Sequence, residues 1–173
     1  MAVQVLRRQE ANTAPLVYAS PEEDIKTQIA SEIFTWVNRL PVPLRERVRD
    51  RFSRVLQAID EEESVSSIKI ESLRAAFRLL IDAKPAVAPS VSVRHDGNLY
   101  LQWFDGRDSI LGVTVKSKDA AIWSASQTDP ADRSKRMNEA GQRPIDALTN
   151  LLRAVSPWVF RESTGEFRRP VAA

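Results

Sequence analysis

The residues from Val91 to Phe104, which read VSVRHDGNLYLQWF, decide the fold that this sequence predicts. At their centre stands Asp96-Gly97, a dipeptide that favours a tight turn between antiparallel strands. We therefore expect a β-hairpin whose two strands span Val91–His95 and Asn98–Phe104.

The second of these strands alternates between two kinds of side chain. A strand places successive side chains on opposite faces of its sheet, so a period of two separates them. The set expected on the core face is Leu99, Leu101 and Trp103, and the opposite set is Tyr100, Gln102 and Phe104. One face of the sheet is therefore predicted to be core.

Two more strands are expected after the hairpin. A turn leads to Ile110–Lys116, which returns with apolar side chains on one side. A second short connection leads on to Ala120–Ser124. Four sequential strands joined by short loops predict an antiparallel β-meander over residues 86–125.

Apolar residues recur at helical spacing on both sides of the predicted strands. The expected helices span about 21–39, from Pro43 to the acidic run that begins at Asp60, about 69–83, and 144–157. Prolines mark these boundaries, because proline fits the first turn of a helix and disfavours helix in the residue before it. The first two helices have a short linker and are expected to pack as an antiparallel hairpin.

Together these elements predict an α+β fold, in which a four-stranded antiparallel meander packs against helices and an N-terminal helical hairpin is added. The chain of 173 residues is long enough for one substantial core, so we expect a single domain over 1–173. Its expected parts are a flexible arm at 1–19, a helical part at 20–83, the meander at 86–125, a polar connection at 126–143, a C-terminal helix at 144–157 and a tail at 158–173.

Composition narrows the classes of function. The net charge is only +2, from 25 Lys and Arg against 23 Asp and Glu, which does not imply bulk affinity for nucleic acid. The lack of cysteine excludes disulfides, thiolate metal sites and cysteine nucleophiles. Because the sequence has no long apolar run and Met1–Arg8 lacks the layout of a signal peptide, we expect a cytoplasmic protein without a membrane partner.

Few residues are suited to catalysis or metal binding. His95 is the one histidine and stands beside a predicted turn, without a second histidine or a cysteine to complete a zinc site or a triad. Asp96 and Asp105 precede glycines in tight turns, and the acidic run Asp60–Glu63 lacks the spacing of a calcium loop. We therefore predict no catalytic residue, metal or cofactor, and no enzyme; an enzyme whose site the sequence hides is the third alternative.

Five arginines lie within ten positions of the second predicted helix. Helical geometry places Arg47, Arg51 and Arg54 on one flank, and arginine binds phosphates and carboxylates bidentately. Either these side chains bind an acidic partner, or surface ion pairs neutralise the helix. The pairs expected in the second case are Glu46–Arg49 and Asp50–Arg54.

Two further groups are candidate partner-binding residues. The basic group, in the polar connection, is Arg133, Lys135 and Arg136. Tyr100 and Phe104, with Trp123 as a further aromatic, remain partly exposed if helices cover only one face of the sheet. The alternative is that helices or the polar connection cover both faces.

A resemblance to known proteins extends over about residues 68–125. The stretch Ile70–Leu80, a proline-containing spacer and the run from Pro89 to Trp103, PSVSVRHDGNLYLQW, precede two more strands. This arrangement resembles a group of small bacterial proteins with a helix followed by a P-x-V…D-G-x-hydrophobic-x-hydrophobic-x-W hairpin. The resemblance implies an accessory protein of the toxin–antitoxin or phage-defence kind, with no catalytic residue to carry over.

The leading expectation is a non-enzymatic binding protein that neutralises or inhibits a partner protein, as antitoxins, immunity proteins and inhibitors do. The expected partner-binding residues are Arg47, Arg51, Arg54, Tyr100, Phe104, Arg133, Lys135 and Arg136. The alternative is a nucleic-acid-associated regulator, or an anti-CRISPR-like anti-defence factor, that uses the basic helix and the basic connection. Association into homo-oligomers stays open.

Overall fold

The structure is a computed structural model that describes residues 21–61, 68–105, 108–129 and 131–160. The predicted arm at 1–19 lies outside these ranges, as do part of the acidic run and most of the predicted tail. The α+β class predicted from the sequence is confirmed. No helix in the described ranges is long and apolar enough to span a membrane.

All four predicted helices are present, with ends that differ by at most two residues from those expected. They are α1 (Pro21–Val37), α2 (Val42–Glu61), α3 (Ile70–Ala83) and α4 (Ile145–Val155). A short 3-10 helix, Pro157–Phe160, follows α4 and buries Val159, so the predicted tail does not begin at residue 158. Helix α3 ends where Lys84 adopts a left-handed conformation (φ 49°) before Pro85.

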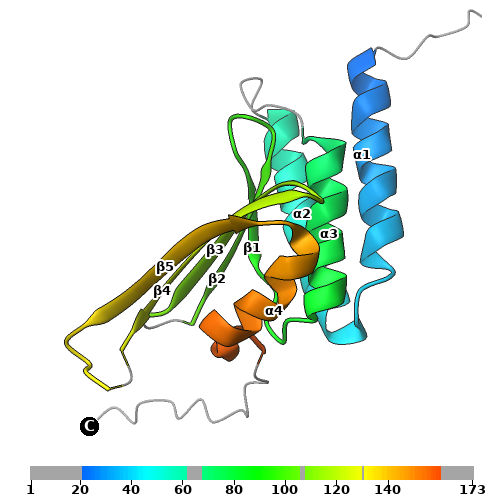
Figure 1. Ribbon diagram of the computed structural model, residues 1–173. Coiled ribbons are helices and arrows are strands. Elements are labelled where there is room, and N and C mark those ends of the chain that lie inside the picture. Colours follow the sequence, from blue (N-terminus) through cyan, green and yellow to red (C-terminus); the bar gives the residue numbers. More distant parts are fainter. Residues whose placement is uncertain (1–20, 62–67, 106–107, 130, 161–173) are drawn as a thin grey trace, which may run out of the picture.

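The sheet has five antiparallel strands, so the prediction of four was wrong. The strands are β1 (Ser90–Val93), β2 (Leu99–Phe104), β3 (Ile110–Ser117), β4 (Ala120–Thr128) and β5 (Arg136–Arg143). They lie side by side in chain order, as a meander requires (Figure 1).

The fifth strand replaces the predicted polar connection at 126–143. Strand β4 continues to Thr128, and β5 pairs with it from Thr128–Arg136 to Ala121–Arg143. The sequence of β5, RMNEAGQR, has no apolar alternation because it is an edge strand whose side chains are mostly exposed. Backbone hydrogen bonds to β4 stabilise this strand. Such bonds cannot be predicted from residue types, because every residue except proline carries the same backbone groups.

The first hairpin has a longer loop than Asp96-Gly97 alone predicts. The Arg94 N–H donates to the Asn98 carbonyl (2.9 Å), and the Gly97 N–H donates to the Arg94 carbonyl (2.8 Å). Three residues therefore connect the paired Arg94 and Asn98, and the third, Gly97, has a positive φ of 76°. This is the hairpin loop in which a turn is followed by a left-handed glycine. Strand β1 accordingly ends at Val93 rather than His95.

Helices cover one face of the sheet, as Figure 1 shows. Helix α3 packs on β2 and β3, α4 on β4 and β5, and α2 on β1, while α1 forms an outer layer on α2 and α3. The predicted core face of β2 is confirmed, because Leu99, Leu101 and Trp103 are at most 3% exposed. Phe52 of α2 stacks on Phe77 of α3 with ring centroids 4.8 Å apart, which joins the two helices above that face.

A buried serine joins the first turn of α3 to strands β2 and β3. The Ser72 hydroxyl donates to the Val115 carbonyl (2.6 Å) and accepts the Leu99 N–H (2.8 Å). Leu99 and Val115 are paired residues of β2 and β3, so the hydroxyl bridges the two strands. Ser72, Leu99 and Val115 are all buried. An unpaired backbone group there would lower the free energy of unfolding, because no water can replace its lost partner.

Replacing Trp103 with alanine should lower the free energy of unfolding by about 3–5 kcal/mol, because it leaves a cavity under the helices. The indole N–H also donates to the Val87 carbonyl (2.8 Å), and that bond would be lost. The matched control is Phe104→Ala on the opposite face, which should change stability by about 0.5 kcal/mol or less. Equal losses in urea denaturation would contradict the assignment of the two faces.

Replacing Ser72 with alanine should cost about 2–3 kcal/mol, because the Leu99 N–H and the Val115 carbonyl lose their shared partner in the core. Ser53→Ala, at an exposed position of α2, is the control and should change stability by less than about 0.5 kcal/mol. Amide hydrogen exchange at Leu99 should speed up in the first variant only. A variant that keeps full stability and slow exchange at Leu99 would show that the bridge is dispensable.

Candidate functional site

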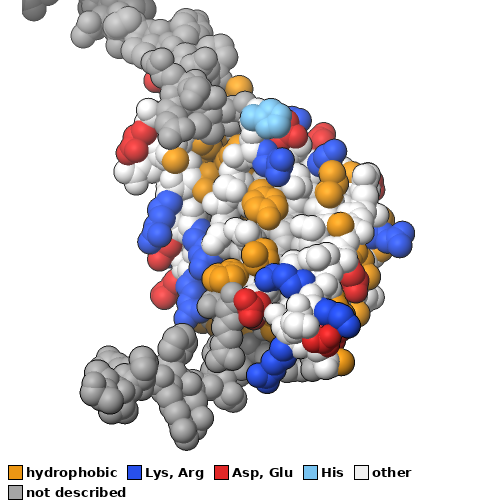
Figure 2. All heavy atoms as spheres, turned by 90° about the vertical axis from the view of Figure 1, so that its left-hand side faces the viewer, with side chains coloured by type: hydrophobic (Ala, Val, Ile, Leu, Met, Phe, Trp, Pro, Cys, Tyr) orange, Lys and Arg blue, Asp and Glu red, His pale blue; other side chains and the backbone are white. Residues whose placement is uncertain are grey.

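The face of the sheet that points away from the helices carries exposed apolar side chains. Figure 2 shows apolar side chains in the middle of this face, the upper one surrounded by white atoms and the lower ones bordered by basic and acidic side chains. Strand register places Tyr100, Thr114 and Ile122 in one row across it and Phe104 and Ile110 in another. Of the described helices, none packs on this side.

We define the apolar patch as Tyr100, Phe104, Ile110 and Ile122. Phe104 is 55% exposed, Ile122 40% and Ile110 36%, which are high values for large apolar side chains. Of the two aromatic residues expected here, Phe104 is thus exposed and Tyr100 partly exposed. The two isoleucines were missed because each looked like one member of an ordinary strand alternation, and only the register shows that they adjoin the aromatic rings.

Trp123 was expected to join these aromatics, and that prediction was wrong. It is 5% exposed and lies on the helix-covered face, because it pairs with the buried Val113. On its other side it pairs with Gly141, where an added Cβ would lie 3.1 Å from the indole nitrogen. The neighbouring residue, Ile122, takes the outward position instead.

The side chain of Tyr100, on β2, lies over the neighbouring strand β3. A Cβ atom on Gly112 would be 2.2 Å from the Tyr100 hydroxyl oxygen and 2.9 Å from the ring carbon that carries it. The ring therefore occupies the space over Gly112 and is half-buried by the sheet. A glycine at this position lets an aromatic ring rest against the backbone.

We define the arginine cluster as Arg47, Arg51 and Arg54 of α2. Arg51 is half-buried, and its guanidinium donates to the Ala88 carbonyl (2.7 Å), just before β1. Burial, followed by the positive charges of Arg47 and Arg54, lowers the pKa of Arg51. The guanidinium group of Arg51 is thus close enough to those of Arg47 and Arg54 to be repelled by both.

The predicted surface ion pairs of α2 are not formed. Among the described residues, Glu46, Arg49, Asp50 and Arg54 take part in no salt bridge. Exposed pairs of this kind gain little over hydration, so side chains at suitable spacing need not meet. The carboxylates therefore do not neutralise the arginine cluster by direct contact.

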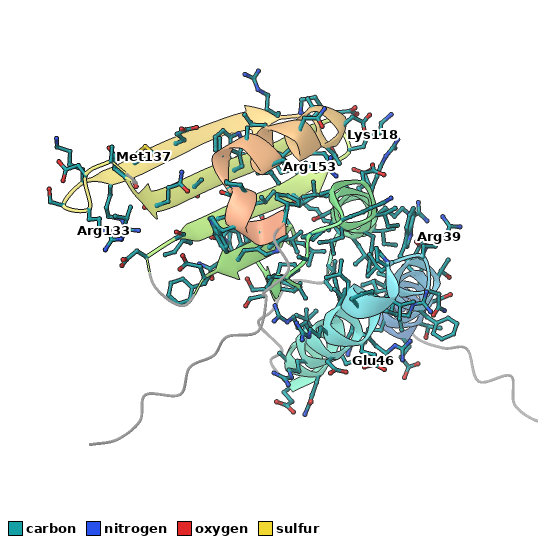
Figure 3. All side chains as sticks on the ribbon, turned by 90° about the horizontal axis from the view of Figure 1, so that it is seen from below. Arg39, Glu46, Lys118, Arg133, Met137 and Arg153 are labelled. Carbon is teal, nitrogen blue, oxygen red and sulfur yellow. The ribbon has the colours of Figure 1, made fainter. Side chains whose placement is uncertain are left out.

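The third predicted group lies elsewhere. Arg133 and Lys135 are in the turn between β4 and β5, and Figure 3 shows Arg133 at the far end of the sheet from Glu46 of α2. Lys135 pairs with Asp132 (3.0 Å). Arg136 begins β5 and donates to the Ser126 hydroxyl (3.0 Å) and the Asp108 carbonyl, at the rim of the apolar patch. The structure does not bring these basic residues together with those of α2.

Neither the apolar patch nor the arginine cluster, both defined from described residues, includes a histidine or a carboxylate. His95 is exposed in the hairpin loop, and the neighbouring carboxyl of Asp96 accepts hydrogen bonds from the backbone and side-chain amides of Asn98. These bonds, the backbone one first, lower the pKa of Asp96. In the described ranges, no three or more His, Asp or Glu side chains are grouped so as to hold a metal ion.

No protein-family model, curated protein or solved structure matches the chain.

Neutralising Glu46 and Asp50 together, as Glu46→Gln with Asp50→Asn, should change the free energy of unfolding by less than about 0.5 kcal/mol, because neither carboxylate forms a salt bridge with a described residue. Urea denaturation at low and at high salt concentration measures this change in the free energy of unfolding. A loss of about 1 kcal/mol or more that disappears in high salt would mean that the carboxylates do neutralise the arginine cluster in solution.

Proposed function

We propose that the protein works by binding, and that the apolar patch docks a partner protein in the manner of an antitoxin, immunity protein or inhibitor. The observation that supports this proposal is the apolar patch itself, on a sheet face that no described helix covers. Exposed apolar groups gathered on one face are a feature of interaction sites, whereas single exposed ones are common everywhere.

The composition of the face favours a protein partner. The cores of protein interfaces are poor in charge and rich in aromatic and large apolar side chains. Around the patch the row Gly112, Ser124 and Ala140 presents small uncharged residues, which leave the four large ones accessible to a complementary surface. A partner with a flat, weakly charged surface fits this arrangement.

A second candidate, single-stranded nucleic acid, is favoured by one specific observation. Tyr100 lies over Gly112, with Phe104 further along β2, and bases stack on aromatic side chains presented by a sheet. Binding of this kind also needs several cations placed for phosphates. Arg136 at the rim already donates to Ser126 and Asp108, and no charge stands within the patch, so this candidate ranks second.

The test is photocrosslinking from the patch in the cells that produce the protein. A photoreactive phenylalanine analogue at position 104 should give an adduct with one other protein, because the interface would close over that ring. Ile122→Asp in the same chain should remove the adduct and leave the melting temperature unchanged. The matched control carries the analogue at Asn150, an exposed position of α4, and should give none.

Three outcomes would contradict the proposal. Equal adducts from positions 104 and 150 would show that the patch is not a specific site. An adduct only between two copies of the chain would replace the partner protein with self-association. Oligonucleotide binding that weakens linearly with the logarithm of salt concentration, and is lost in Tyr100→Ala, would favour the second candidate.

A further inference from the structure

A groove of about 500 Å³ runs between α2 and the outer edge of β1. From α2 it is lined by Arg51, Arg54, Val55, Ala58 and Ile59, and from β1 by the whole strand. The α2 residues are three, four, seven and eight positions from Arg51, which is the spacing of one helix face. The groove thus has one apolar stripe, with arginine at one end of the stripe.

The edge of β1 offers backbone groups to this groove. Because the Arg94 N–H donates to Asn98, these two residues form a hydrogen-bonded pair across the hairpin. Such pairs alternate along an antiparallel ladder, so Ser92 directs its backbone groups toward β2. Val91 and Val93 therefore direct their N–H and carbonyl groups outward, away from β2.

The two outer edges of the sheet differ in how open they are to pairing. Strand β5 carries Arg136, Glu139 and Arg143, and charges along an edge discourage the addition of another strand. Strand β1 reads SVSV and has no charge. Its length of four residues and the neighbouring α2 restrict what can pair there, so β1 suits a short extended segment rather than a second sheet.

Charge indicates the chemistry of that segment. Arg51 donates one bond to Ala88, and a guanidinium has five N–H donors. None of the described carboxylates pairs with any member of the arginine cluster. A carboxylate that enters the groove would meet the guanidinium groups of Arg51 and Arg54, with which no described carboxylate pairs, and would reduce the repulsion between them.

We propose that the groove between α2 and β1 binds an extended acidic segment of a partner protein by strand addition to β1. Main-chain hydrogen bonds form with Val91 and Val93, and alternate apolar side chains of the segment rest on Val55 and Ile59. An Asp or Glu of the segment pairs with Arg54. This is the mode by which sheet edges recognise peptides, with backbone bonds for affinity and pockets for specificity. The groove is distinct from the apolar patch, which is on the other face.

The experiment selects peptides from a displayed random library on the full-length chain and measures them by fluorescence polarisation. The selected peptides should contain Asp or Glu and alternate with apolar residues. Val93→Pro should lower the affinity for these peptides at least about tenfold, because it removes an outward N–H that the β1–β2 ladder does not use. Arg54→Glu should do the same by charge reversal, while Arg49→Glu, outside the groove on the same helix, should change affinity less than about twofold.

Amide exchange keeps the test decisive if Val93→Pro fails to fold. In the unmodified protein, a bound peptide should slow exchange of the Val91 and Val93 amides and leave that of Tyr100 unchanged. Selected peptides without acidic residues, unchanged affinity in Arg54→Glu, or no selected peptide at all would overturn the proposal. So would single-stranded oligothymidylate that displaces the peptide and is unaffected by Val93→Pro, because phosphate recognition does not need the strand edge. Peptide binding that is lost only in Ile122→Asp would assign the peptide to the apolar patch instead.

Discussion

The Ser72 hydroxyl, shared between the Leu99 N–H and the Val115 carbonyl, is the contact on which the arrangement of layers depends. It comes from the buried face of the first turn of α3 and reaches the first residue of β2 and the residue paired with it near the end of β3. A hydrogen-bonded group in a dry core is specific in a way that apolar packing is not, because a shifted helix would leave both backbone groups unpaired. It therefore fixes the position of α3 and, with it, which face of the sheet is covered.

That choice of face produces the surfaces that are left open. Once α3, α4 and α2 lie on the side of Trp103, the side chains of opposite parity on β2 and β3 have no cover from these helices. Of these three helices, α2 lies beside β1 and forms one side of a groove along the sheet edge, which Arg51 and Arg54 of the arginine cluster line. One architecture thus gives an apolar surface and, separately, a cationic edge.

Each error of prediction has a structural cause. Strand β5 was missed because an edge strand that buries almost nothing has no apolar period to detect, and its pairing is made by backbone atoms that every residue carries. Trp123 was expected to face outward because most side chains of β4 are small, so their alternation does not show which face is the core. Its pairing with the buried Val113 shows that Trp123 is on the core face. The arginine flank on α2 was found, but the predicted ion pairs were not formed, since spacing permits a pair without stabilising it.

The sequence by itself determined the four helices, the first hairpin and the buried face of β2. Each is predicted by apolar residues that recur at a regular local spacing and by a proline or glycine at the boundary. It also indicated the candidate side chains Tyr100, Phe104 and the arginine cluster. Only the tertiary structure decided which of them meet. Ile110 and Ile122 complete the apolar patch, and Arg133 lies far from α2 in the turn between β4 and β5. Arg51 and Arg54 of the arginine cluster line a groove beside the edge strand β1. The physical reason is that local periods describe one element at a time, whereas a surface is made where elements distant in sequence are brought side by side by a shared core.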